Sequence, residues 1–237
     1  MHQERPRLKG NKLAAYNHIT KQEDRILVIG DLHLPFCLDG YLEHCKKVYS
    51  DNNLNKVIFI GDIIDSHAFS YHEPDPNGMS AGDELEASIE DVKEWYDAFP
   101  VADVLIGNHD RLAFRKATTG GIPKQWIKDY NEVLKTPQWN WCETIVYNDI
   151  LFEHGEGGQA RTKAKNNMMS SVCGHTHTEA YVNWHVGKKF KIFSMQVGCG
   201  VDASSYAANY ARAFKKQAIG CGVILGNHTA FNSLMDL

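Results

Sequence analysis

The sequence predicts an α/β fold with a largely parallel sheet in its first half, and three observations lead to that prediction. Short apolar runs, RILVIGD, KVIFIGD and DVLIGNHD, recur along the first 110 residues of the chain. Each run is rich in β-branched and aliphatic residues, as expected of strands that are buried on both faces. Stretches with helical spacing separate the runs, and strand–helix–strand alternation is typical of parallel sheets.

The helices of the first half are placed by apolar residues that recur at intervals of three and four. This spacing predicts helices over 39–51 and 82–98, which lie between the three strands. Two further helical stretches are expected after the third strand, at about 111–118 and 123–135.

Hairpins are expected in the second half of the chain. One should turn at Asn148 and Asp149 and another at Gly187 and Lys188, because these residue types favour tight turns between apolar runs. The other expected elements are a polar helix over 159–170, a helix over 205–217 and a last strand, CGVILGN.

Composition limits the class of protein. Hydrophobic residues make up 43% of the 237 residues, which permits a sizeable core, and the formal net charge of −4 gives no reason to expect a strongly basic surface. The longest apolar runs fall short of the roughly 20 residues of a membrane helix. Six cysteines without a CxxC pair and an N-terminus without an apolar leader lead us to expect a cytoplasmic protein with no membrane partner. We expect a polar N-terminal arm over 1–24 and a single domain over 25–237.

Polar side chains recur at one structural position, directly after each predicted strand. The residues at these positions are Asp31, His33, Asp62, Asp65, Asn108, His109, Asp110, His154, His175 and His177. Because the carboxyl ends of the strands of an open α/β sheet line one crevice, we expect these side chains to converge. Carboxylate, amide and imidazole groups together suit divalent ions such as Mn²⁺, Fe or Zn²⁺, and a carboxylate can bridge two ions about 3.5–4 Å apart.

The blocks GDLH, GDIID, GNHD, EHG and GHTH, in this order over residues 30–177, resemble the five signature blocks of the calcineurin-like metallophosphoesterase superfamily. The resemblance implies a four-layered α/β sandwich, with two mixed β-sheets packed face to face and helices on the outside. It also implies hydrolysis of a phosphate ester through a metal-bridging hydroxide. The expected cofactors are two divalent ions, Mn²⁺ first, with Fe, Zn²⁺ or Ni²⁺ as alternatives.

The resemblance assigns a role to each matching residue. Asp31, His33 and His177 would hold the first ion, and Asn108, His154 and His175 the second. Asp62 would bridge the two ions. His109 would face the leaving group or a phosphoryl oxygen, and Asp65 would hydrogen-bond to His109 and orient it.

Several residues near the blocks have more than one possible role. Arg111 is expected either to pair with a substrate phosphate or to lie solvated in the first turn of a helix, and His67 either contacts substrate or is structural. Asp110 is expected to cap a helix. Three tryptophans are expected to pack in the core or in a lid rather than stack on bases: Trp126, Trp139 and Trp141.

The substrate class can be narrowed by comparing these blocks with those of one branch of the superfamily. Serine/threonine protein phosphatases typically carry GDxxDRG and GNHE, whereas this chain has Ser66 and Asp110 at the arginine and glutamate positions. The form GNHD with GHTH resembles the phosphodiesterase and nuclease branches, so the leading hypothesis is a phosphodiesterase that acts on a nucleotide or nucleic acid. A phosphomonoesterase, a nucleotide pyrophosphatase and a non-catalytic metal-stabilised scaffold remain alternatives. Residues 66–82 and 111–143 would form any specificity rim.

Overall fold

The computed structural model describes residues 24–71, 75–206 and 216–236. The expected N-terminal arm lies outside the described residues except for Asp24. Most of the helix expected over 205–217 also lies outside them.

The first sheet has six strands in the order β11-β10-β1-β2-β3-β4. The strands β1 to β4 run parallel, while β10 pairs antiparallel with β1 and β11 antiparallel with β10. The bounds are β1 (Arg25–Ile29), β2 (Lys56–Phe59), β3 (Ala102–Leu105), β4 (Trp139–Cys142), β10 (Gly220–Leu225) and β11 (Thr229–Leu234). The three strands expected in the first half are therefore confirmed, together with the last expected strand.

The second sheet has five strands in the order β5-β6-β7-β9-β8. Both expected hairpins are confirmed: β5 and β6 turn through Asn148 and Asp149, whose φ angles are 50° and 60°, and β8 and β9 turn after Gly187. The bounds are β5 (Thr144–Tyr147), β6 (Ile150–Glu153), β7 (Ser170–Cys173), β8 (Tyr181–Val186) and β9 (Lys191–Gln196).

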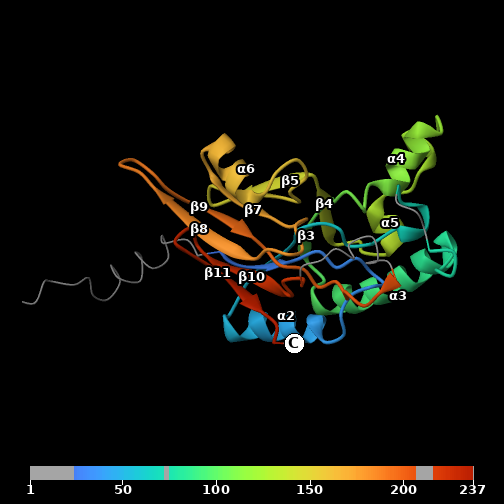
Figure 1. Cartoon of the computed structure of the whole chain (residues 1–237), viewed down its shortest axis with the longest axis horizontal. Coiled ribbons are helices and arrows are strands. Elements are labelled where there is room, and N and C mark those ends of the chain that lie inside the picture. Colours follow the sequence, from blue (N-terminus) through green and yellow to red (C-terminus); the bar gives the residue numbers. More distant parts are fainter. Residues whose placement is uncertain (1–23, 72–74, 207–215, 237) are drawn as a thin grey trace, which may run out of the picture.

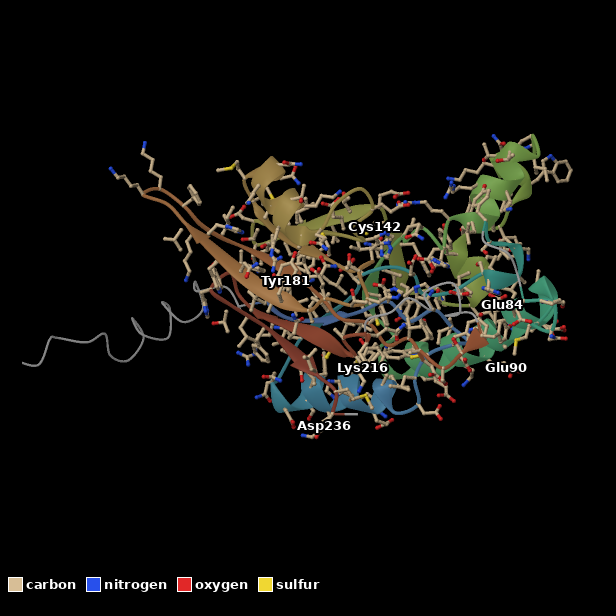
Figure 2. All side chains as sticks on the ribbon, in the orientation of Figure 1. Glu84, Glu90, Cys142, Tyr181, Lys216 and Asp236 are labelled. Atoms are coloured by element: carbon tan, nitrogen blue, oxygen red, sulfur yellow. The ribbon has the colours of Figure 1, made fainter. Side chains whose placement is uncertain are left out.

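Helices cover the outer faces of the two sheets (Figure 1). The helices α2 (Tyr41–Asp51) and α3 (Ala81–Ala98) lie on the first sheet, and α6 (Ala160–Asn167) packs on β7 and β9 of the second. The described chain ends at Asp236 beside α2, as Figure 2 shows. The order helix–sheet–sheet–helix is the expected four-layered α/β sandwich.

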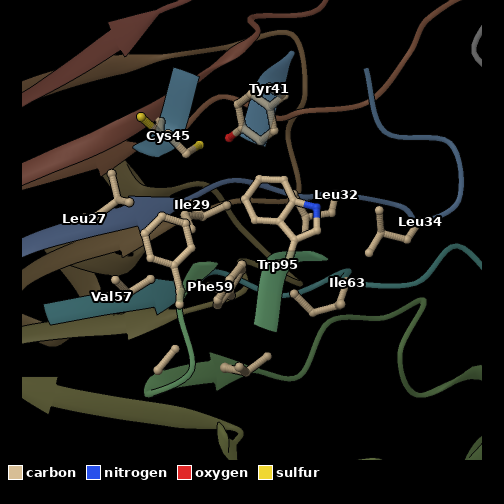
Figure 3. Packing of buried hydrophobic residues seen from close by; sticks show 14 of the residues in the cluster. Leu27, Ile29, Leu32, Leu34, Tyr41, Cys45, Val57, Phe59, Ile63 and Trp95 are labelled. Carbon is tan, nitrogen blue, oxygen red and sulfur yellow. The ribbon is translucent and has the colours of Figure 1, made fainter. Parts of the chain in front are cut away.

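The core is divided by the first sheet, because successive side chains of a strand point to opposite faces. Leu27 and Ile29 of β1 pack toward α2 and α3, where Tyr41 and Trp95 meet them (Figure 3). Ile26 and Val28 point the other way and pack between the two sheets, together with apolar residues of β6, β7 and β9. The alternating side chains of β1 thus join the first sheet both to its outer helices and to the second sheet.

The segment after β3 differs most from the sequence-based expectation. The structure has α4 (Leu112–Thr119) as expected, but the predicted helix over 123–135 is a 3₁₀ turn, η2 (Lys124–Trp126), followed by a short α5 (Tyr130–Leu134). The side chain of Asp129 accepts a hydrogen bond from the N–H of Glu132 and so starts a new helix, because aspartate favours a cap over a helix interior.

The tryptophans of this region have different environments. Trp139 and Trp141 lie on β4, a strand that the sequence analysis did not anticipate, and they pack against the core as expected. Trp126 is 82% exposed, so the expectation of core packing is wrong for this residue. Among the residues that the structure describes, no helix is long and apolar enough to span a membrane.

Candidate metal centre

The loops that follow the strands bring carboxylates and imidazoles together in three overlapping clusters. Within each cluster the potential ligand atoms all lie within 4.8 Å of one another. The clusters are Asp31–His33–His177, His33–Asp62–His109 and Asp62–His154–His175. Since His33 and Asp62 each belong to two clusters, the three form one continuous site.

Asn108 extends the cluster that contains His154. Its Oδ1 lies 3.0 Å from His154 Nε2, and His154 Nε2 lies 3.1 Å from Asp62 Oδ2. His175 Nδ1 approaches the same imidazole nitrogen to within 3.2 Å. The structure therefore brings together all seven residues that the sequence analysis named as metal ligands.

Hydrogen bonds behind the centre fix the orientation of the imidazoles. His33 Nδ1 donates to the Asp65 carboxylate at 2.5 Å, and His154 Nδ1 donates to the carbonyl of Ile60 at 2.9 Å. Because these oxygens can only accept, each Nδ1 carries a proton, and Nε2 is the nitrogen that would bind a cation once it has lost any proton of its own.

The backbone is unusual at the same residues. His33, Asp62 and His175 have φ angles of 51°, 51° and 69°, a left-handed conformation that costs energy for residues other than glycine. Three such residues in one small region indicate that the fold holds these side chains against a local preference.

Two glycines let the backbone approach the carboxylates. A Cβ atom on Gly107 would lie 2.0 Å from Asp62 Oδ1, and one on Gly174 would lie 2.3 Å from Asp31 Oδ1. Either distance is too short for non-bonded atoms, so a side chain at these positions would displace a candidate ligand.

Unsatisfied polar atoms test whether the site suits a cation. Asp31 Oδ1, His33 Nε2 and Asp65 Oδ2 are buried and have no hydrogen-bond partner within the described part of the chain. Buried polar atoms normally have partners, and a divalent cation held by the clusters would supply them for the first two. The donors are carboxylate and amide oxygens with imidazole nitrogens, so the residues fit a divalent ion of the Mn²⁺, Fe or Zn²⁺ type.

Electrostatic interactions favour the ionised carboxylates. Burial raises the pKa of Asp62, but the charge and hydrogen bond of His154 outweigh it, and the pKa lies well below its ordinary value. The pKa of His109 is lowered by burial and by the neighbouring His33. This shift favours the neutral imidazole, although the nearby Asp62 and Asp65 carboxylates act in the opposite direction.

Asp65 contacts two histidines through different groups. Its carboxylate bonds His33, whereas its backbone carbonyl accepts the Nδ1–H of His109 at 2.6 Å. The carboxylate oxygen lies 3.4 Å from His109 Nδ1. The expected contact between Asp65 and His109 is thus present, but it is made mainly by the main chain.

Asp110 does not cap a helix, which corrects the expectation from the sequence. Its carboxylate accepts backbone N–H groups of Asp62, Ile63 and Gly107 at 2.8–2.9 Å and of Ile64 at 3.3 Å. Burial, together with the charge of Asp62, raises the pKa of Asp110 to about 7. This side chain joins the loop after β2 to the loop after β3 and so holds Asp62 beside Asn108.

The two expected substrate contacts are engaged by other groups of the chain. Arg111 forms ion pairs with Glu143 and Glu156. His67 is buried in η1 (His67–Phe69), and its Nε2 accepts the backbone N–H of Asp75 at 3.3 Å.

A further positioning residue, Glu84, was not anticipated. It lies on α3 (Figure 2), and its carboxylate accepts the N–H groups of His67 and Ala68 at 2.7 and 2.9 Å. A glutamate in the first turn of a helix is ordinarily solvated, so the sequence contained no signal for this contact.

Clustered carboxylates and imidazoles at the strand ends of an α/β sandwich are suited to binding divalent metal ions. The model of the calcineurin-like phosphoesterase family matches residues 24–191, and the chain belongs to that family. The comparison with curated proteins found no match.

Solved structures with similar folds have low sequence identity to this chain. An archaeal protein described as a novel phosphodiesterase is 15% identical, with a TM-score of 0.49, and the match covers 89% of this chain and 99% of that one. Vacuolar protein sorting 29 from Cryptosporidium parvum is 12% identical, with 91% and 98% covered and a TM-score of 0.45. Nuclease MPE from Pseudomonas putida is 11% identical, with 88% and 86% covered and a TM-score of 0.38.

Proposed function

We propose that this chain is a metal-dependent phosphodiesterase that hydrolyses a nucleotide or nucleic-acid phosphodiester. The observation that carries the proposal is that Asp62 belongs to two ligand clusters at once, in a chain of the calcineurin-like phosphoesterase family. A carboxylate shared between two clusters can serve as a common ligand of two metal ions.

The ligand sets proposed are those expected from the sequence. Asp31, His33 and His177 would hold one divalent ion, and Asn108, His154 and His175 would hold a second. Asp62 would be the ligand that both ions share. We propose Mn²⁺ as the first ion to test, which agrees with the oxygen and nitrogen donors of the site. Bound divalent ions supply Lewis-acid stabilisation of phosphoryl oxygens and make water nucleophilic near neutral pH.

His109 is proposed to act on the leaving group. Its Nδ1–H is occupied by the carbonyl of Asp65, so Nε2 is the atom that can give a proton to the leaving oxygen as the P–O bond breaks. The negative charge of a bound phosphate favours the protonated imidazole that this step needs. Asp65 acts as a positioning residue for both His109 and His33.

The small number of available cationic side chains around the centre supports a preference for a diester. Ser66 stands where the protein phosphatases have an arginine, and Arg111 is already paired with two carboxylates. A phosphomonoester dianion needs more positive charge than a diester monoanion does. A centre whose neighbouring guanidinium is engaged therefore suits the diester better.

The test compares hydrolysis of bis(para-nitrophenyl) phosphate with that of para-nitrophenyl phosphate, using metal-stripped protein to which Mn²⁺ is added back. We expect faster turnover of the diester and loss of turnover in His109→Ala. A preference for the monoester would contradict the diesterase proposal and support a phosphomonoesterase. Lack of turnover of both compounds with metal bound would contradict catalysis and support the scaffold alternative.

A further inference from the structure

One segment of the surface has a charge opposite to that of the whole chain. Residues 111–128, here named the α4 arm, contain no aspartate or glutamate, although the chain has a formal net charge of −4. The cationic residues of the arm are Arg111, Arg115, Lys116, Lys124 and Lys128. Glu143 and Glu156 neutralise Arg111, and Glu132 pairs with Lys128. Among the described residues no carboxylate forms an ion pair with the three middle cations, Arg115, Lys116 and Lys124.

The α4 arm also exposes large apolar side chains. Trp126 is 82% exposed and Ile122 is 49% exposed. A tryptophan has about the largest apolar surface of any residue, and leaving it in water without a partner is costly. Beside the arm, the half-exposed ring of Tyr71 has the Arg115 guanidinium 4.9 Å and the Lys116 ammonium 4.1 Å from its centroid. Cations and aromatic rings therefore alternate along this surface.

The arm starts directly at the candidate metal centre. The N–H of Leu112 donates to the carbonyl of His109 at 3.0 Å, and the Tyr130 hydroxyl donates to the carbonyl of Asp110 at 3.2 Å. From there α4 projects away from both sheets (Figure 1). A groove of about 500 Å³ runs along it, lined by Tyr71, Phe114, Arg115, Lys124 and Tyr130 and by the ion pair of Arg111 with Glu143.

We infer that the α4 arm is a docking surface for single-stranded nucleic acid, which leads one phosphodiester of the strand to the metal centre. This inference rests on the proposed function and names its substrate class. Arg115, Lys116 and Lys124 contact backbone phosphates, and an unpaired base stacks on the exposed face of Trp126.

Two features favour a single strand over other polyanions. A positively charged groove combined with exposed aromatic rings is the usual means of binding unpaired nucleotides, because every base has a face that can stack. In a duplex the bases are already stacked on each other, so Trp126 would gain nothing from it. An acidic protein would use the cations but would not require a planar ring.

The test measures binding and turnover of a twelve-nucleotide oligodeoxythymidylate by the Mn²⁺-loaded protein. Fluorescence anisotropy of the labelled strand gives the Kd. Turnover rates on the strand and on bis(para-nitrophenyl) phosphate distinguish an effect on the α4 arm from an effect on the metal centre. The variants are Trp126→Ala, Trp126→Phe and the double variant Arg115→Gln/Lys124→Gln. Lys188→Gln/Lys189→Gln removes the same charge from the exposed turn of the β8–β9 hairpin, at the opposite end of the molecule (Figure 1).

We expect Trp126→Ala to weaken oligonucleotide binding about 5- to 150-fold, the usual range for loss of one stacked base, while Trp126→Phe restores most of it. The arm double variant should also lower the slope of log Kd against log salt by about 1.4, since each phosphate contact contributes roughly 0.7 on single strands. All variants should hydrolyse bis(para-nitrophenyl) phosphate at the wild-type rate, and the hairpin variant should bind as wild type does.

Oligonucleotide Kd values within twofold of wild type in both Trp126→Ala and Arg115→Gln/Lys124→Gln would overturn the inference. Equal losses of oligonucleotide affinity in the arm and hairpin variants would also overturn it, because binding would then depend on overall charge rather than on the α4 arm. If the wild type hydrolyses bis(para-nitrophenyl) phosphate but neither binds nor cleaves the strand, the docking surface is refuted and the proposed chemistry stands. If the wild type cleaves neither compound, the proposed chemistry fails, and the anisotropy measurement still decides the binding.

Discussion

At the scale of single residues, the side chain of Asp110 shows how much of a site can depend on one buried group. It satisfies four backbone N–H groups from two loops and has 1% of its surface exposed. In Asp110→Asn the amide would turn an NH₂ group toward some of these donors. We expect the free energy of unfolding to fall by about 2–4 kcal/mol, measured by urea denaturation.

The control for this variant is Asp129→Asn at the start of α5. Asp129 is exposed and accepts a single N–H, and asparagine caps a helix about as well as aspartate does. We therefore expect a change below about 0.5 kcal/mol in the control. Similar small losses in both variants would mean that Asp110 does not hold the two loops together.

The two aspartates of the candidate centre should differ in their effect on metal binding. Asp62 belongs to two ligand clusters and Asp31 to one. Asp62→Asn should therefore lose more bound metal than Asp31→Asn, measured as metal content per chain after equilibration with Mn²⁺ and desalting. Equal metal contents in the two variants would contradict the proposed bridging role of Asp62.

At the scale of elements, the contact of α3 with η1 links a helix of the outer layer to the site. Glu84 accepts two N–H groups of η1, which follows Asp65 and Ser66 directly. Glu84→Gln should cost about 1–3 kcal/mol, because one of these donors would face an amide NH₂ group. Thermal denaturation measures the loss, and Glu86→Gln, exposed on the same helix, should change stability by less than about 0.5 kcal/mol. A Glu84→Gln variant as stable as the control would show that α3 does not hold η1.

Sequence patterns predicted elements well where local and tertiary preferences agree. The strands β1, β2 and β3 are largely apolar and are followed within two residues by a glycine, so their type and the polar residues after them could be placed from the sequence. The helix expected over 123–135 failed because Asp129 starts a separate helix in the middle of the apolar pattern. The strand β4 was missed since its alternating WNWC carries only four residues of pattern.

The candidate site was predictable to a similar extent. The convergence of Asp31, Asp62 and Asn108 follows from the parallel strands β1, β2 and β3, which a chain of alternating strands and helices implies. His154 follows β6 of the second sheet, so its place in the site depended on the resemblance to the family. The partners of Asp110, Arg111 and Glu84 depend on distances between loops, and residue type carries no information about those distances. For this reason the sequence analysis expected Asp110 to cap a helix, left Arg111 between a substrate phosphate and solvent, and assigned no role to Glu84.

At the scale of the whole molecule, the proposed ions should contribute to stability as well as to chemistry. A ligand that binds only the folded state stabilises it by mass action, by about 2.7 kcal/mol at a hundred times its Kd. Chelation should therefore lower the Tm, and Mn²⁺ added back should restore it, as measured by scanning calorimetry. The control is Asp62→Asn, whose Tm should respond weakly to either treatment. A wild-type Tm that changes neither on chelation nor on addition of Mn²⁺ would contradict the proposed metal centre.

The position of β1 between β2 and β10 has a consequence for how the chain folds during its synthesis on the ribosome. β1 is the first described strand to leave the ribosome, yet one of its two neighbours comes from residues 220–225, close to the C-terminus. The loop that carries Asp31 is likewise held by late residues, since Asp31 forms a β-bridge with Cys199 and its carbonyl accepts the N–H of Gly200. Until residues 220–225 have been synthesised, the edge of β1 that pairs with β10 is unpaired and can pair with other nascent chains. A prematurely terminated polypeptide would thus keep every motif of the family and still lack the last strands that close its central sheet.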